Sequence, residues 1–123
     1  MADTVATVKN GDVVRLTNLC DGTGESAVIK IDKSATKASA GRLGIERIQA
    51  NIYGFTYVDL LFDHTADDLA IRLNPGNYIV DYSALGGIVD PESAGGTGDI
   101  VLTTAGNTAG DYYDITLWLR YYN

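Results

Sequence analysis

The sequence predicts an all-β fold, a single-domain antiparallel β-sandwich of eight or nine strands in a jelly-roll-like arrangement. Short runs rich in Val, Ile, Thr and Tyr recur about every ten residues, and turns that contain glycine separate them. No segment sustains the 3.6-residue period of an amphipathic helix. The composition agrees, because 14 Gly and two Pro among 123 residues are typical of strands joined by tight turns. One domain covering residues 1–123 is expected at this length.

Each expected strand is bounded by a turn. The first, 4–8, ends at Asn10-Gly11, a strong hairpin signal because both residues tolerate positive φ. The other expected strands are 12–18, 26–32, 45–53, 57–63, 69–73, 78–82, 99–104 and 112–122. The main alternative fold is an oligonucleotide-binding barrel, which the acidic charge of the chain disfavours.

Two segments interrupt this pattern. Residues 33–44 are small, polar and basic, so a surface loop with at most one helical turn is expected, with Lys33, Lys37 and Arg42 in solvent. Residues 83–98 include five glycines and a proline, and a loop this long is more often functional than decorative.

The charge of the chain is uneven. Residues 1–50 hold seven basic and six acidic side chains (+1), and residues 51–123 hold two basic and ten acidic ones (−8), which gives the net −7. Duplex nucleic acid requires a basic surface, so no nucleic-acid partner is expected. The acidic half suits docking on a basic protein surface.

Membrane and export signals are not apparent in the sequence. No apolar run approaches the roughly 20 residues that span a bilayer, and the first residues lack the apolar segment of a secretory signal. Cys20 is the single cysteine, which rules out an intrachain disulfide and favours a small core residue. We therefore expect a soluble protein made in a reducing compartment, with no membrane partner.

The stretch "FDHTADD", residues 62–68, is the first candidate for chemistry because it holds the single histidine, His64, among three carboxylates. Zinc usually takes several Cys or His ligands. A calcium-binding loop that started at Asp63 would need Gly at its sixth position and Glu at its twelfth, where Asp68 and Asn74 stand. No nucleophile motif accompanies the histidine. We therefore expect a solvated turn, with weak cation binding near 63–68 as the alternative, and no catalytic residue, metal or cofactor.

Two glycine motifs, "DGTGE" at 21–25 and "GGTGD" at 95–99, resemble phosphate-binding loops only superficially. Phosphate-binding loops open a helix, whereas both of these lead into a strand and end in an acid that would repel phosphate. We expect both to be turns.

The last strand, 112–122, has aromatic residues on both faces. One interpretation is that both faces are buried between packed layers. The other is that its second face contacts another subunit, because aromatics and Arg are enriched in interface cores. The candidate interface residues are four from this strand and two from the long loop: Tyr112, Trp118, Arg120, Tyr122, Ile88 and Val89.

Three stretches, "NGDVVRLTNLCDGTGESAVIKID", "GFTYVDLLFDHTADD" and "GGTGDIVLTTAGNTAGDYYDITLWLRYYN", are similar in the same order to small virion structural proteins of marine tailed phages, a group that includes cyanophages. The resemblance implies a non-enzymatic virion protein and transfers no catalytic motif. Small size and all-β character favour a capsid decoration (cement) protein, made in the host cytoplasm and located on the capsid surface. Such a protein binds the major capsid protein at symmetry axes, as a homo-oligomer such as a trimer, and stabilises the head. Two alternatives stay open: a phage tail or fibre component, and a carbohydrate-binding β-sandwich module.

Overall fold

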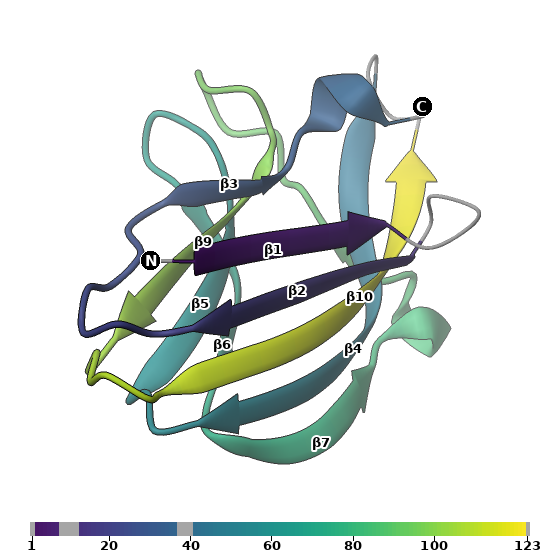
Figure 1. Ribbon diagram of the computed structural model, residues 1–123. Coiled ribbons are helices and arrows are strands. Elements are labelled where there is room, and N and C mark those ends of the chain that lie inside the picture. The colour runs from purple at the N-terminus through teal and green to yellow at the C-terminus, as the bar shows by residue number, and fades with distance from the viewer. Residues whose placement is uncertain (1, 8–12, 37–40, 123) are drawn as a thin grey trace.

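The protein folds into two stacked antiparallel sheets (Figure 1). The computed structural model describes residues 2–7, 13–36 and 41–122, with only the backbone for 2–7. The Asn10-Gly11 turn and Lys37 lie outside these residues. Within them are nine strands of four or more residues and a two-residue strand, β8, so the predicted all-β sandwich is confirmed. The strands are β1 (Ala2–Thr7), β2 (Val13–Leu19), β3 (Val28–Ile31), β4 (Arg42–Tyr53), β5 (Tyr57–Phe62), β6 (Asp68–Leu73), β7 (Gly76–Asp81), β8 (Ile88–Val89), β9 (Ile100–Ala105) and β10 (Tyr112–Tyr122).

The strand order is that of a jelly roll. One sheet runs β1-β2-β10-β4-β7, with β8 on the far end of β4, and the other runs β3-β9-β5-β6. The pairs β2 with β10, β3 with β9, β4 with β7 and β5 with β6 are nested, as in one long hairpin folded at the β5–β6 turn. Rolling this hairpin up adds the pairs β10 with β4 and β9 with β5, which complete the two sheets.

Apart from shifts of one or two residues at other strand ends, the expected and observed elements differ at three places. β4 begins at Arg42, inside the expected loop 33–44, so Arg42 is a half-buried strand residue paired with Glu92 (2.9 Å) rather than a solvated one. β3 is shorter than expected, because Ala27 adopts positive φ (49°) just before it. The long segment 83–98 is partly ordered, with a 3-10 turn at Ser83–Leu85 and then β8.

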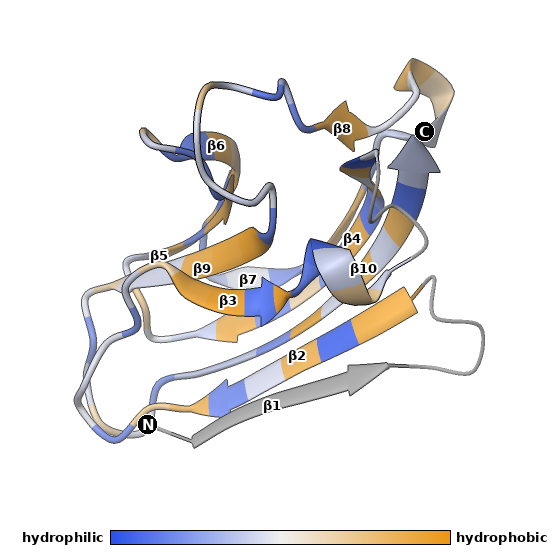
Figure 2. Cartoon of the chain, turned by 90° about the horizontal axis from the view of Figure 1, so that it is seen from above, coloured by the Kyte–Doolittle hydropathy of each residue, from blue (hydrophilic) through white to orange (hydrophobic). Residues whose placement is uncertain are grey.

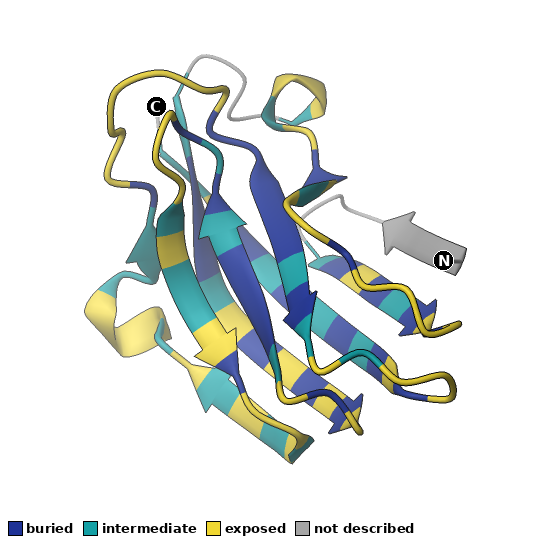
Figure 3. Cartoon of the chain, turned by 90° about the vertical axis from the view of Figure 1, so that its left-hand side faces the viewer, coloured by how far each residue is buried: buried dark blue, intermediate teal, exposed yellow. Residues whose placement is uncertain are grey.

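The core lies between the sheets. Along β2 more and less buried residues alternate (Figure 3), and in its middle, from Val14 to Thr17, the buried residues are the apolar ones (Figure 2). The inner face of β10 contributes Tyr113, Ile115, Leu117 and Leu119, which are all buried. Cys20 is buried as predicted. In the described part of the chain, no helix has the length and apolar character needed to cross a membrane.

The outer face of β10 is not covered. Tyr112 and Arg120 are exposed, and Trp118 and Tyr122 are half-buried, although β10 lies between β2 and β4. The interpretation in which both faces of the strand are buried between layers is therefore wrong. The second sheet lies on the opposite side of β10, and the segment around Gly86 reaches the outer face only near Tyr122 in the described part of the molecule.

Candidate functional site

The turn that follows β5 is held by its own side chains and by the start of β9. Asp67 Oδ1 accepts from the His64 amide (3.0 Å), and the Asp63 amide donates to the Asp99 carbonyl (2.8 Å). Thr97 donates to Asp63 Oδ2 from both its hydroxyl (2.8 Å) and its amide (3.2 Å). The Thr97 hydroxyl is the main reason that the pKa of Asp63 is lowered. These bonds fix the backbone on both sides of His64.

The glycine-rich segment 90–98 packs directly onto this turn. The Gly98 amide donates to the Asp63 carbonyl (2.9 Å). Gly96 has φ of +69°, and a Cβ there would lie 2.4 Å from the Asp63 carbonyl oxygen and from His64 Cα. A residue with a side chain cannot approach so closely, so glycine is required here. The two motifs noted separately in the sequence, "FDHTADD" and "GGTGD", are therefore in contact.

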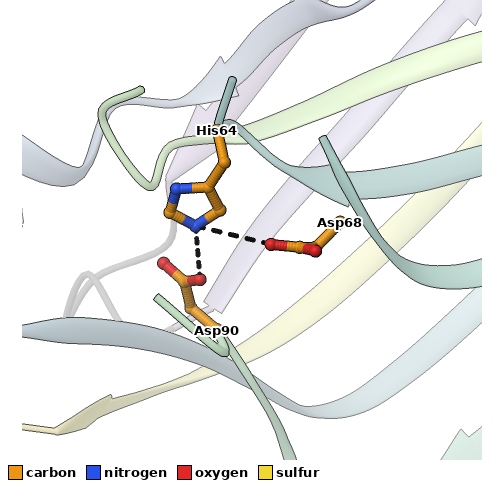
Figure 4. Close-up of side chains that lie close together, drawn as sticks. All are labelled: His64, Asp68 and Asp90. Carbon is orange, nitrogen blue, oxygen red and sulfur yellow. Dashed lines mark hydrogen bonds and ion pairs between the residues drawn. The ribbon is translucent and has the colours of Figure 1, made fainter. Parts of the chain in front are cut away.

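His64 is buried beneath that contact and has a partner for each ring nitrogen, and Figure 4 shows the two carboxylates near Nε2. Its Nε2 lies 2.6 Å from Asp90 Oδ1 and 3.8 Å from Asp68 Oδ2, and its Nδ1 lies 2.8 Å from the Gly95 carbonyl oxygen. The residue is 8% exposed, so the expectation of a solvated turn is wrong for His64. The cause is Asp90, 26 residues further along the chain, whose amide donates to the Leu43 carbonyl (3.1 Å) and whose carboxylate lies against the ring.

The chemistry of the ring follows from its neighbours. A carbonyl oxygen can only accept, so Nδ1 carries a hydrogen and donates it to Gly95. Burial works to lower the pKa of His64, but the Gly95 carbonyl, the Asp90 carboxylate and the more distant Asp68 together raise it above its usual value. In its charged form the ring donates from both nitrogens. Even then the cluster holds two carboxylates against one cation.

Asp68 is the member of this cluster whose buried oxygen lacks a hydrogen bond. Its Oδ2 is buried and has no hydrogen-bond partner, although its side chain as a whole is 29% exposed. His64 Nε2 and one oxygen each of Asp68 and Asp90 all lie within 4.8 Å of one another. These three atoms converge from two stretches of the chain: the turn from β5 into β6, which holds both His64 and Asp68, and the end of β8, where Asp90 follows.

A second candidate lies on the outer face of the sheet. Leu19, Tyr112 and Tyr53 are neighbours across β2, β10 and β4, since Tyr112 pairs with both of the others. They are 62%, 40% and 62% exposed, and we call these three residues the apolar row. The two tyrosine rings stack on each other, with centroids 5.5 Å apart and planes inclined by 16°. The Arg15–Asp114 ion pair (2.6 Å) lies beside the row on the same face.

The six residues predicted as an interface do not form one patch. Tyr112 belongs to the apolar row, at the start of β10. At the other end of β10, the Tyr122 hydroxyl donates to the Gly86 carbonyl, and the guanidinium of Arg120 lies 5.8 Å from the Tyr122 ring. Ile88 and Val89 are half-buried where β8 pairs with β4.

Trp118 lies between these two ends of β10. The Arg47 guanidinium is 5.3 Å from its ring, beside a shallow depression that Asp81 and Ser83 also line.

Sequence reasoning missed Leu19, Tyr53 and Asp90. Leu19 and Tyr53 each end a strand, where an apolar residue can point either way. Asp90 stands between Val89 and Pro91 in a segment expected to be a loop. The sequence feature that could have indicated a role for Asp90 is the length of that loop, because loops this long are uncommon inside a compact domain and are often functional.

No protein-family model, curated protein or solved structure matches the chain. The resemblance to phage virion proteins therefore stays a prediction.

Proposed function

We propose that the protein is a non-catalytic assembly protein that binds another protein through the outer face of the sheet β1-β2-β10-β4-β7. Its partner is the major capsid protein of a phage head, bound at symmetry axes, and its role is that of a decoration protein that stabilises the shell. The capsid assignment rests on the sequence resemblance, because a jelly-roll fold by itself serves many functions.

The observation that carries the proposal is the apolar row. Three large apolar side chains stand side by side across three strands, and two of them are tyrosines, a residue type enriched in interface cores. The Arg15–Asp114 pair supplies the polar rim that surrounds such cores. Burying exposed apolar area on a capsid would stabilise the assembly by about 25 cal/mol per Å² before the costs of association.

The orientation of the tyrosines favours a protein partner over a sugar. Carbohydrate platforms offer flat ring faces to the ligand. Here the rings of Tyr53 and Tyr112 face each other across neighbouring strands, so each has one face covered by the other. At most one face of each ring is therefore left for a sugar to stack on, whereas packing between protein side chains can use ring faces and edges alike.

The proposal is tested by adding the purified protein to expanded capsids of a marine tailed phage and measuring bound copies and the disruption temperature of the capsids. We expect binding at a fixed stoichiometry and a higher disruption temperature. Leu19→Glu and Tyr112→Ala should each weaken binding at least tenfold, because they remove the centre of the contact. Because both side chains are exposed, the thermal unfolding temperature of the free protein should change by only a few degrees.

The matched control is Ile29→Glu. Ile29 is 57% exposed but lies on β3, in the other sheet, so this variant should bind capsids as the wild type does. If both apolar-row variants bind capsids as the wild type does, the row is not part of the interface. If labelling of this protein in intact virions shows it on the tails and not on the heads, the protein is a tail or fibre component and the capsid assignment is wrong. Binding to a glycan array that both row variants abolish would favour the carbohydrate module.

A further inference from the structure

We propose that His64 Nε2, Asp68 Oδ2 and Asp90 Oδ1 bind one divalent cation of the zinc or manganese class, and that this ion fastens the glycine-rich segment 90–98 to the turn 63–68. The site is independent of the apolar row and of the identity of the binding partner. It joins two stretches that are separate in sequence, the turn that holds His64 and Asp68 and the segment that begins at Asp90, so an ion bound there would cross-link the end of the jelly roll where β5, β6 and β8 meet.

The histidine is already oriented as a metal ligand. Ligating histidines commonly donate the hydrogen of one ring nitrogen to a carbonyl or carboxylate, which fixes the tautomer and points the other nitrogen at the ion. His64 Nδ1 lies 2.8 Å from the Gly95 carbonyl oxygen, so in the neutral ring Nε2 carries the lone pair. That nitrogen is directed at the two carboxylates (Figure 4).

The unbonded oxygen of Asp68 is the second observation. When the ring is charged, Nε2 donates to Asp90, and this hydrogen bond satisfies those two groups. It leaves Asp68 Oδ2 buried with no hydrogen bond, only an ion-pair contact of 3.8 Å to His64. A buried acceptor left without a hydrogen bond destabilises the folded state, so such a group calls for an explanation. A cation coordinated by all three groups supplies the missing partner.

The charge of the cluster leads to the same conclusion. Two carboxylates face one imidazole, and the other basic side chain that packs near Gly98 is Lys33. The Lys33 amine donates to the Gly41 carbonyl (2.9 Å), and among the described ion pairs none joins Lys33 to Asp90. A divalent ion would neutralise the two carboxylates of the cluster.

The mixed donor set decides the class of ion. Calcium and magnesium prefer all-oxygen shells, whereas imidazole suits zinc and its neighbours in the first transition row. Donor atoms that share an ion at bond lengths of about 2.1 Å lie roughly 3.0–3.4 Å apart. The observed separations from Nε2, 2.6 Å to Asp90 and 3.8 Å to Asp68, bracket that range, so shifts below about 1 Å form the site. The partly exposed side chain of Asp68 offers a route from solvent.

The test is to remove ions from the full-length protein with EDTA, dialyse the chelator away, and measure thermal unfolding with added ZnCl2, MnCl2 or CaCl2. We expect Zn²⁺ or Mn²⁺ to raise the unfolding temperature by several degrees at a large excess over the dissociation constant, and Ca²⁺ to do less. Asp68→Asn should abolish this ion-dependent rise. It should still fold, because Asp68 Oδ2 makes no hydrogen bond in the structure.

Glu46→Gln, on β4, makes the same change of charge outside the cluster and should keep the full ion-dependent rise in unfolding temperature.

A second measurement does not depend on stability. The single histidine gives one pair of imidazole nitrogen signals in long-range 15N NMR, and Zn²⁺ should shift the Nε2 signal while Nδ1 keeps its hydrogen. An equal response of Asp68→Asn and wild type to the ions, or an Nε2 signal that Zn²⁺ leaves unchanged, would overturn the proposal.

Discussion

Two buried charged clusters lie near opposite ends of β9, and they differ in how completely their groups are paired. At one end the Glu25 amide donates to the Thr104 hydroxyl (3.0 Å), and the Glu25 carboxylate forms an ion pair with Lys30 (2.6 Å). At the other end, where Asp99 precedes β9, His64 lies between Asp90 and Asp68.

In the first cluster the ionised groups are fully paired, and in this sense it is closed. Glu25 Oε2 accepts from Lys30, and Oε1 accepts from Asn18 Nδ2 (2.9 Å) and the Tyr113 hydroxyl (2.6 Å). One negative charge meets one positive charge, and the two side chains are 2% and 1% exposed. The second cluster is open, with an excess of negative charge and an unbonded Asp68 oxygen. The difference indicates that the first is a structural pair, complete in the folded chain, whereas the second has room for a further charge.

The largest effect should come from breaking the closed pair. Lys30→Met leaves the Glu25 carboxylate buried without its cation, and loss of one partner from a buried ion pair typically costs 3–5 kcal/mol. We expect the free energy of unfolding, measured by urea denaturation, to fall by about 4 kcal/mol.

The double variant Glu25→Gln/Lys30→Met is the control for that result. The glutamine oxygen can still accept from Asn18 and Tyr113, and no charge stays buried. The double variant should therefore be more stable than Lys30→Met alone. A Lys30→Met variant within 1 kcal/mol of wild type would contradict the description of this cluster as a tight pair.

A somewhat smaller effect is expected where the glycine-rich segment packs on the His64 turn. Gly96→Ala places a Cβ into the backbone of Asp63 and His64 at positive φ, so the segment must move away. We expect the free energy of unfolding to fall by about 3 kcal/mol. The Gly98 amide, which donates to the Asp63 carbonyl in the wild type, should exchange its hydrogen faster in the variant.

Gly86→Ala is the matched control for this steric argument. Gly86 has a similar φ of +84°, but nothing lies within 4 Å of its Cβ position. The free energy of unfolding of this variant should fall only by the cost of holding a side chain in the left-handed conformation, about 1–2 kcal/mol. Equal losses for the two variants would mean that close packing at Gly96 contributes little.

Much of the fold was predictable because it depends on local pattern. The alternation in 57–63 and 112–122 and the turns between strands specify where strands run and which side of each faces the core. β8 was missed because two apolar residues, Ile88 and Val89, are too short a run to show alternation. The burial of Lys30 could not be read from the sequence, because a charged residue is rarely fully buried unless paired, and its partner Glu25 stands in a turn.

The candidate site was harder to predict because it depends on contacts distant in sequence. "FDHTADD" offers one histidine and nearby acids, which is ordinary for a polar turn. The burial of His64 results from the jelly-roll winding, which brings Asp90 and Gly95 to the ring from a segment whose sequence predicts a loop. No pattern in residues 62–68 alone contains that information.

The smallest effect distinguishes the two carboxylates of the open cluster in ion-free protein. Asp90→Asn removes the charge from a buried hydrogen bond to His64 at 2.6 Å, which should cost about 2 kcal/mol. Asp68→Asn removes an ion-pair contact at 3.8 Å from a partly exposed side chain, worth up to about 1 kcal/mol. It also relieves a buried oxygen that has no hydrogen bond, so the net change in unfolding free energy in EDTA should lie within about 1 kcal/mol of zero. A loss at Asp68 as large as that at Asp90 would mean that Asp68 is already paired without an ion, and the cluster would then be closed like that of Glu25 and Lys30.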